Sequence, residues 1–197
     1  MIINDGTGSG KQAKVDVANR IHAYSVEVTE AQSALQTGDA YNWNTGNITL
    51  TSAADTSVMY LKNNEDRDVL IDAVALGFKA DTSGAGTDMV EITIVRNPTA
   101  GDIITNANNV DINQNRDFAS SNTFTGNVYK GATGETLLSG GNDLIFVYSG
   151  VSTRFFSSSL NLHLAKGDSV GINVKPRASN TSMVMYAALI GHLQVAV

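Results

Sequence analysis

The stretch Leu160-Asn-Leu-His-Leu-Ala-Lys-Gly-Asp-Ser-Val-Gly-Ile-Asn-Val174 decides the fold class. Leucines alternate with polar residues up to Leu164, and valine or isoleucine alternates with glycine and asparagine from Val170 onward. Because successive side chains of a β-strand point to opposite faces, each half is typical of a strand with one buried face. Gly167 and Asp168 lie between the halves and favour a tight turn, so the stretch predicts a β-hairpin.

Short apolar patterns of the same kind recur along the chain. Further strands are expected near residues 48–50, 58–61, 69–78, 90–94, 144–148 and 183–197. The run 69–78 is apolar on nearly every residue, which predicts that both of its faces are covered. About eight to ten short strands with frequent turn residues predict an all-β fold, an antiparallel β-sandwich of jelly-roll type.

One short helix is expected near the N-terminus. Thr29 is a suitable N-cap, Gln32 follows it three positions later, and Gly38 supplies a C-terminal stop. Residues 1–28 are interpreted as an extended arm with the first strands, and residues 29–197 as a single β-sandwich domain. A stretch near 99–142, rich in Asn, Gly, Thr and Ser, is expected to be a long loop insertion in that domain.

The arm is expected to be an interface. Its first twelve residues are small and Gly-rich, so ordering them costs much backbone entropy and requires contacts with something else. The candidate interface residues are Ile2, Ile3, Val15, Val17 and Ile21, which we expect to be buried only against another chain.

Composition and charge disfavour several classes of partner. The net charge of −6 gives no attraction for nucleic acid or for an anionic membrane surface. No stretch approaches the roughly 18 uninterrupted apolar residues of a membrane span. The chain has no cysteine, so neither disulfides nor thiolate metal sites are expected.

The motifs of catalysis and cofactor binding are incomplete. The sequence from Gly6 to Lys11 is glycine-rich like a phosphate-binding loop, but its glycine spacing is one residue too short. The three histidines are not at metal-ligand spacing, and no Gly-x-Ser-x-Gly sequence supplies a nucleophile. His163 is expected to be an ordinary exposed strand residue. The protein is therefore predicted to be neither an enzyme nor a cofactor carrier.

Two binding sites remain open alternatives at this stage. The sequence after Asp111 has alternating oxygen ligands, but Arg116 stands where a calcium-binding EF-hand loop needs glycine. An irregular calcium site with Asp111, Asp117 or Asp102 is the alternative to a solvated polar loop. Trp43 with Tyr41 is expected to be a buried aromatic anchor, and the alternative is a platform on which a sugar stacks.

Parts of the first 75 residues resemble a group of virion structural proteins of tailed bacteriophages. The similar segments are Asn4-Asp-Gly-Thr-Gly-Ser-Gly10, Ala13-Lys-Val-Asp16, Asn19-Arg-Ile21, Ile48-Thr-Leu-Thr51 and Tyr60-Leu-Lys-Asn63. The resemblance implies a place on the virion, other virion proteins such as the major capsid protein as partners, and no catalytic residues.

Three functions are consistent with these features. The preferred function is that of a capsid decoration or cement protein. The alternative is a neck, collar, tail or fibre-base component. A receptor-binding or carbohydrate-binding module is the third. A homo-oligomer, with a trimer favoured, is expected because 69–78 and 183–186 are continuously apolar. The stretch from Leu164 to Val170 also resembles trimeric jelly rolls of the tumour-necrosis-factor-like kind.

Overall fold

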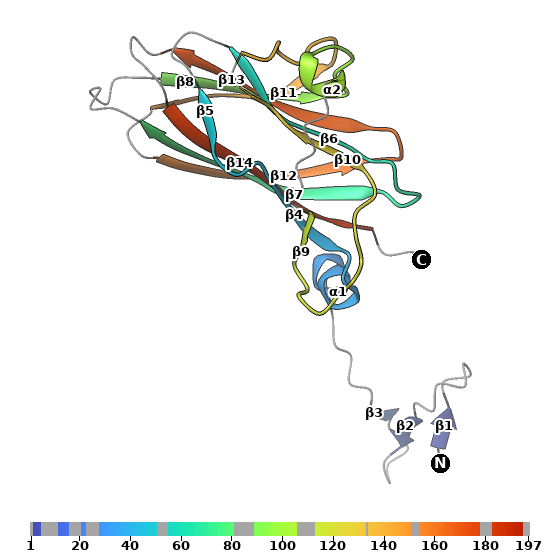
Figure 1. Ribbon diagram of the computed structural model, residues 1–197. Coiled ribbons are helices and arrows are strands. Elements are labelled where there is room, and N and C mark those ends of the chain that lie inside the picture. Colours follow the sequence, from blue (N-terminus) through green and yellow to red (C-terminus); the bar gives the residue numbers. More distant parts are fainter. Residues whose placement is uncertain are drawn as a thin grey trace.

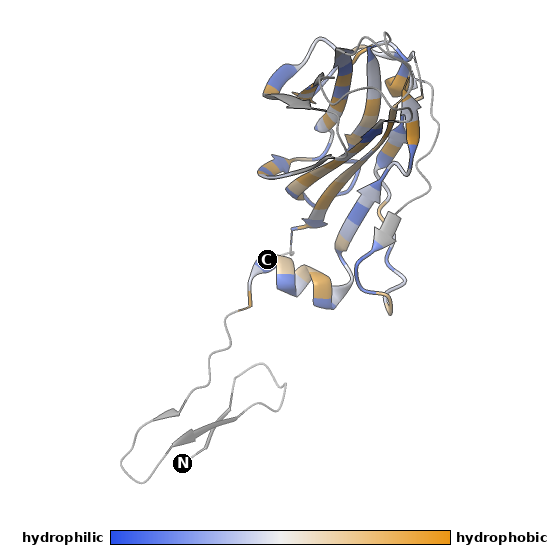
Figure 2. Cartoon of the chain, turned by 90° about the vertical axis from the view of Figure 1, so that its left-hand side faces the viewer, coloured by the Kyte–Doolittle hydropathy of each residue, from blue (hydrophilic) through white to orange (hydrophobic). Residues whose placement is uncertain are grey.

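Alternating apolar residues place two antiparallel β-sheets face to face in a sandwich (Figure 1). The computed structural model describes residues 2–4, 12–15, 21–22, 28–50, 55–80, 89–105, 113–132, 134–150, 154–177 and 183–194. Figure 2 shows hydrophobic and hydrophilic residues alternating along the strands, as expected where one face of a sheet packs on the core. The predicted all-β sandwich is therefore confirmed at this level.

The two sheets contain most of the strands. The five-stranded sheet has the order β10 (Asn127–Lys130), β6 (Thr56–Lys62), β13 (Ser169–Arg177), β8 (Met89–Arg96) and β11 (Asn142–Gly150). The six-stranded sheet has the order β12 (Arg154–Leu164), β7 (Val69–Ala80), β14 (Met183–Leu193), β4 (Ala40–Asn44) and β9 (Asn113–Asn115), with β5 (Ile48–Leu50) also paired to β14. Two of these strands, β9 and β10, lie in the predicted loop insertion, together with the short helix α2 (Asp102–Thr105).

The predicted hairpin between β12 and β13 is wrong, although both strands form. Strand β12 pairs with β7, whereas β13 pairs with β6 and β8 in the other sheet. The turn between them bonds to the β6–β7 turn instead: Asn63 N donates to Asp168 O at 2.9 Å, and Gly167 N donates to Asn63 O at 2.7 Å. A turn sequence predicts a chain reversal but not the sheet that receives the next strand, because the backbone groups can be satisfied by another turn.

Strands far apart in the chain pair in a nested order. Strand β8 pairs with β11, β7 with β12, β6 with β13, and β4 with β14. Along the sequence, each pair of strands encloses the previous pair. The first and last of these strands in the chain, β4 and β14, are therefore neighbours in the sheet. The two sheets are thereby linked by strands that alternate between them along most of the chain.

One apolar core fills the space between the sheets. Strand β7 contributes Val69, Ile71, Val74, Leu76 and Phe78, all buried. The inward face shifts by one position after Ile71, where the register between β7 and β14 is also irregular. The other residues of this strand therefore lie on the outer face of the six-stranded sheet.

The predicted helix is confirmed as α1 (Glu30–Thr37). Thr29 Oγ1 accepts from Gln32 N at 3.2 Å, and Gln32 Oε1 accepts from Thr29 N at 3.0 Å, which is a complete capping box. Gly38 ends the helix with a φ of 77°, a left-handed conformation that favours glycine.

The N-terminal residues form a separate small sheet. Strands β1 (Ile2–Asn4), β2 (Gln12–Val15) and β3 (Ile21–His22) are antiparallel and have the order β1-β2-β3. Neither larger sheet includes any of these strands.

Candidate assembly surfaces

The aromatic residues that suggested a sugar platform are inside the protein. Trp43 has no exposed surface, and Tyr41 is 1% exposed. Trp43 stacks on Tyr41 with ring centroids 5.7 Å apart and meets Phe124 edge-on at 5.0 Å. The predicted buried anchor is confirmed, and the alternative of a platform at Trp43 and Tyr41 is wrong because no ligand can reach these rings.

The residues considered for metal binding are scattered in the described part of the chain. Asp102 lies on α2, and its Oδ2 accepts hydrogen bonds from both N and Oγ1 of Thr136. Asp117 Oδ1 accepts from Ala119 N in the loop after β9, at the other end of the sandwich (Figure 1). Asp111 lies outside the described residues. No group of three or more His, Cys, Asp or Glu residues is placed to hold a metal ion among the residues that the structure describes.

Two histidines each contact a carboxylate near one end of the six-stranded sheet. His163 is exposed, as predicted, and its Nε2 lies 2.7 Å from Asp68 Oδ2. His192 is buried, and its Nδ1 lies 3.1 Å from Asp72 Oδ2. Both histidines are in register with Leu70 on β7, so they lie on the same face of the sheet.

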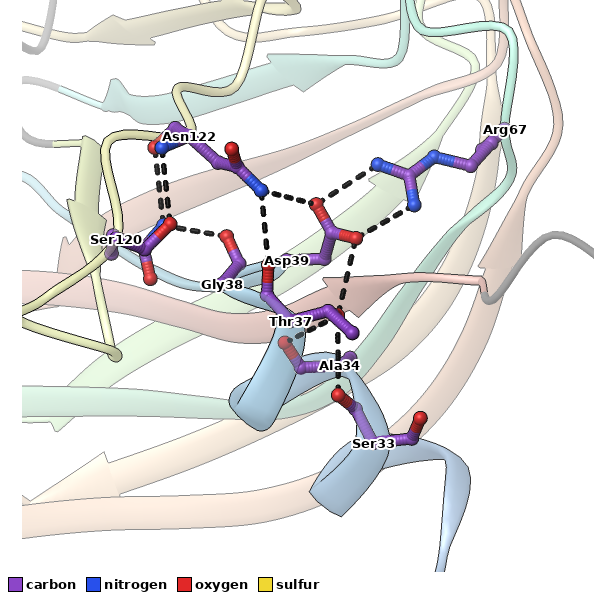
Figure 3. A network of polar contacts seen from close by, with 9 residues as sticks. Ser33, Ala34, Thr37, Gly38, Asp39, Arg67, Ser120 and Asn122 are labelled. Atoms are coloured by element: carbon purple, nitrogen blue, oxygen red, sulfur yellow. Dashed lines mark hydrogen bonds and ion pairs between the residues drawn. The ribbon is translucent and has the colours of Figure 1, made fainter. Parts of the chain in front are cut away.

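A polar network joins α1 to two distant turns (Figure 3). The Arg67 guanidinium donates to both carboxylate oxygens of Asp39, at 2.7 and 2.9 Å. Asn122 Nδ2 donates to Thr37 O at 3.0 Å and to Asp39 Oδ1 at 3.3 Å. The hydrogen bond from Arg67 is the main reason why the pKa of Asp39 lies below its ordinary value of 3.8.

Replacing Asp39 with Ala should destabilise the protein by about 1 to 2 kcal/mol at neutral pH, because it leaves Arg67 and Asn122 without their shared acceptor. Arg67 is 35% exposed, so we set this cost below that of a fully buried pair. Since the pKa of Asp39 is lowered by folding, its stabilisation is present above pH 3.8 and is lost as the pH falls below that value. Urea unfolding at pH 7 and pH 3 measures both effects.

The matched control is Asp66→Ala, which removes an aspartate from an exposed ion pair with Lys166. Its stability at neutral pH should be unchanged. Equal effects of the two substitutions would contradict the role assigned to the Asp39 network.

The same network holds the turn at residues 116–120 against α1. Asn115 Nδ2 donates to Gly38 O at 2.6 Å, and Asn115 Oδ1 accepts from Asp117 N at 2.9 Å. Ser120 N then donates to Asp117 O at 3.1 Å, which closes the turn. Phe118 at its tip is 101% exposed. A shallow depression beside it is lined by Leu35, Gln36 and Arg116, among other residues.

The outer face of the five-stranded sheet is covered by its own chain. Tyr60 packs there with Ile103 of α2 and with Leu138, and all three are buried. Asn173 on β13 fixes this cover, because its side chain accepts from Leu138 N at 2.9 Å and donates to Leu138 O at 2.8 Å. The Leu138 side chain lies over Gly171, where a Cβ atom would be 2.0 Å from Leu138 Cδ1.

One carboxyl group in this cover is buried at an energetic cost. Glu135 Oε2 is buried and has no hydrogen-bond partner in the part of the chain that the structure describes. Burial raises the pKa of Glu135 above its ordinary value of 4.5, and the nearby charge of Asp102 acts in the same direction.

Glu135→Gln should therefore stabilise the protein by about 1 kcal/mol at pH 7, because it removes a buried negative charge. The folded-state pKa is raised, so the charged group costs stability only above pH 4.5, and the gain should vanish at pH 4. Thermal melting at the two pH values measures the difference. The exposed carboxylate of Asp143 supplies the control, since Asp143→Asn should leave melting unchanged at both.

The outer face of the six-stranded sheet is different, and we name its central part the open face. Its residues point away from the core, because they alternate along each strand with the residues that face inward. They are Ala73, Ala75 and Gly77 on β7, Val184, Tyr186, Ala188 and Ile190 on β14, Asn42 and Asn44 on β4, and Ser157 and Ser159 on β12. None of these residues carries a charge, and the exposed Lys79, directly opposite Val184, borders the face at that end. Among the described elements, Figure 1 shows α1 at one end of this sheet and nothing else against the open face.

Small residues surround one tyrosine on the open face. The Tyr186 ring lies along the sheet over Gly77, where a Cβ atom would be 2.0 Å from Tyr186 Cε1. Ala75 and Ala188 sit directly opposite each other beside it. A tyrosine among uncharged residues is typical of the centre of a protein interface, where charged residues are depleted and aromatic residues enriched.

The predicted arm residues are only partly brought together. Val15 is paired with Ile21, and Ile3 with Ala13, whereas Ile2 is paired with Lys14. Val17 lies outside the described residues. Their predicted burial against another chain stays a prediction.

The comparisons with known proteins add no identification. No protein-family model matches the chain, and no curated protein matches it. In the described residues, neither helix has the length and apolarity needed to cross a membrane.

Proposed function

We propose that this protein is a structural, non-enzymatic component of a tailed-phage virion, which acts as a capsid decoration or cement protein by protein–protein assembly. The open face carries the proposal. Its central residues carry no charge, on a chain of net charge −6, and the chain covers the opposite face of the sandwich itself. Such a face is stabilised when another protein removes it from water.

We further propose that the sandwich is a jelly roll and that the protein assembles as a homotrimer through the open face. The nested strand pairs support the jelly roll, since this fold wraps a long paired ribbon around the core. Self-association is supported by charge. Most other surfaces of an acidic protein repel those of its copies, whereas the open face brings no like charges together.

The place on the particle rests on the resemblance of the N-terminal segments to phage virion proteins. A neck, collar, tail or fibre-base component uses the same assembly chemistry and is the alternative. A carbohydrate-binding role is less well supported, because Trp43 and Tyr41 are in the core.

Two measurements test the proposal. Sedimentation equilibrium of the purified chain should show a species of three times 20.8 kDa at micromolar concentration. Labelling of an engineered tag on purified particles, viewed by electron microscopy, should place the chain on the capsid. A monomer at all concentrations, together with its absence from particles, would refute the function.

Deleting residues 1–12 should leave the thermal melting of the sandwich nearly unchanged, because these residues belong to neither of its sheets. Retention of the protein on particles should fall, since the arm is proposed to dock on other virion chains. Quantitative gels of washed particles measure the retention. Unfolding of the truncated protein, or undiminished retention, would contradict this role.

A further inference from the structure

Each sheet of the sandwich has one short and one long edge strand. In the five-stranded sheet the edge strands are β10, with four residues, and β11, with nine. In the six-stranded sheet they are β9, with three residues, and β12, with eleven. Proteins commonly keep edge strands short, charged or interrupted by proline, because unpaired backbone groups at an edge pair readily with another chain. A long edge strand is therefore a candidate site for a strand of another molecule.

Strand β12 has few of the features that block pairing at an edge. Between Arg154 and His163 it contains no charged residue and no proline. Its pairing with β7 is regular up to Ser159 and irregular from there to Leu162. Asn161 lies in the irregular part with a φ of 47°, so the bulge limits the regular edge to the residues before it. Among the described strands, β7 alone pairs with β12.

The unpaired edge of β12 determines the chemistry of its partner. Backbone N–H and C=O groups that point away from β7 follow one another along β12 at the spacing of an extended strand. Only another extended strand satisfies such a row of donors and acceptors. Ser157 and Ser159 beside this edge are exposed, small and uncharged, so they leave the backbone accessible.

We propose that β12 of one copy pairs with β12 of a second copy in antiparallel orientation, so that the six-stranded sheet continues from one copy into the next. Two identical antiparallel strands are self-complementary across a two-fold axis, because each contact occurs twice. The regular, uncharged stretch 155–159 overlaps fully with its copy when the axis passes beside Ser157. Charge favours a second copy, since this stretch of an acidic protein brings no like charges together.

The edge contact is separate from the open face and does not rest on the proposed trimer. A single edge pair is weak, because a few backbone hydrogen bonds return little more free energy than association costs. Several edges on one assembly act together, since the first contact raises the effective concentration for the next. Edge pairs therefore serve to join one assembled unit to its neighbour.

The absence of cysteine allows a direct test by disulfide trapping. Ser157→Cys places two thiols opposite each other across the axis, with Cα atoms about 4.5 to 5.5 Å apart, which suits a disulfide. We expect disulfide-linked dimers when the concentrated protein is treated with oxidised glutathione. Ser159→Cys is the matched control, because Ser159 is also exposed and lies on the same strand and face. Its two copies are four residues apart, about 13 Å, and should give at least about tenfold less dimer.

Repeating the trapping with Ile190→Asp in every chain separates the edge from the open face. The Ser157→Cys dimer should persist, because Ile190 is not on β12. Loss of the dimer in this background would assign the crosslink to the open face and overturn the inference. A dimer that forms although the wild type never assembles as a trimer would refute the proposed trimer and leave the edge contact standing.

Hydrogen exchange of the crosslinked dimer is the second readout. The amides of 155–159 that point away from β7 should exchange at least about tenfold more slowly in the oxidised than in the reduced protein, because each gains a carbonyl partner. Unchanged exchange, or equal crosslinking from Ser157→Cys and Ser159→Cys, would show chance collision instead of strand pairing. A Ser157→Cys crosslink on particles that joins only another virion protein would show that the second-copy assignment is wrong.

Discussion

Ile190→Asp is expected to convert the assembled protein into monomers. Ile190 is the last open-face residue of β14, the central strand of the sheet, and lies opposite Ala73 on one neighbouring strand and Asn42 on the other. Aspartate there would bring one buried, unpaired carboxylate per subunit into the interface, at a cost of about 3 kcal/mol or more. That cost corresponds to about a 100-fold weaker association.

Sedimentation velocity over a range of concentrations measures this loss. Leu144→Asp is the matched control, because Leu144 is a 41% exposed apolar residue on β11, at the edge of the other sheet. The control should associate like the wild type. Circular dichroism must show both variants folded, and an Ile190→Asp protein that is folded and still fully assembled would contradict the assignment of the open face.

Trp43→Ala should have the largest effect on the stability of the fold. Trp43 is completely buried, stacks on Tyr41 and meets Phe124 edge-on, so truncation removes both apolar burial and aromatic contacts. The expected loss is about 3 to 5 kcal/mol, because the neighbouring strands cannot collapse fully into the cavity. For a chain of this size, that loss lowers the melting temperature by about 6 to 20 °C.

Scanning calorimetry at one fixed protein concentration measures this change, since assembly makes melting depend on concentration. Trp43→Phe keeps an aromatic ring and should lose less than half as much. A Trp43→Ala protein that melts within about 2 °C of the wild type would show that this cluster does not hold β4 and the loop around Phe124 to the core.

Local sequence signals were sufficient wherever a few neighbouring residues determine the structure. The helix after Thr29 was predictable because its capping box and its stop at Gly38 involve only local hydrogen bonds. The strands were predictable because the alternation of apolar residues directly reflects one buried face. The open face was partly predictable from the continuously apolar runs at 69–78 and 183–186.

Phe118 carried no usable signal, because a single aromatic residue in a polar loop looks the same whether it is buried or exposed. Its exposure follows from the hydrogen bonds of Asn115 and Asn122 to α1, which join residues about eighty positions apart. This feature is not encoded in any short segment.

The sequence by itself determined the β class, the positions of most strands, the capped helix and the inward-facing apolar residues of the long strands. Only the tertiary structure decided which sheet each strand joins, and the segment from Leu160 to Val174 shows why. Its leucine and valine faces share one core whether the strands pair with each other or lie in opposite sheets. In the folded protein β12 pairs with β7 and β13 with β6 and β8, and Asn63, about a hundred residues away, satisfies backbone groups of the turn between them.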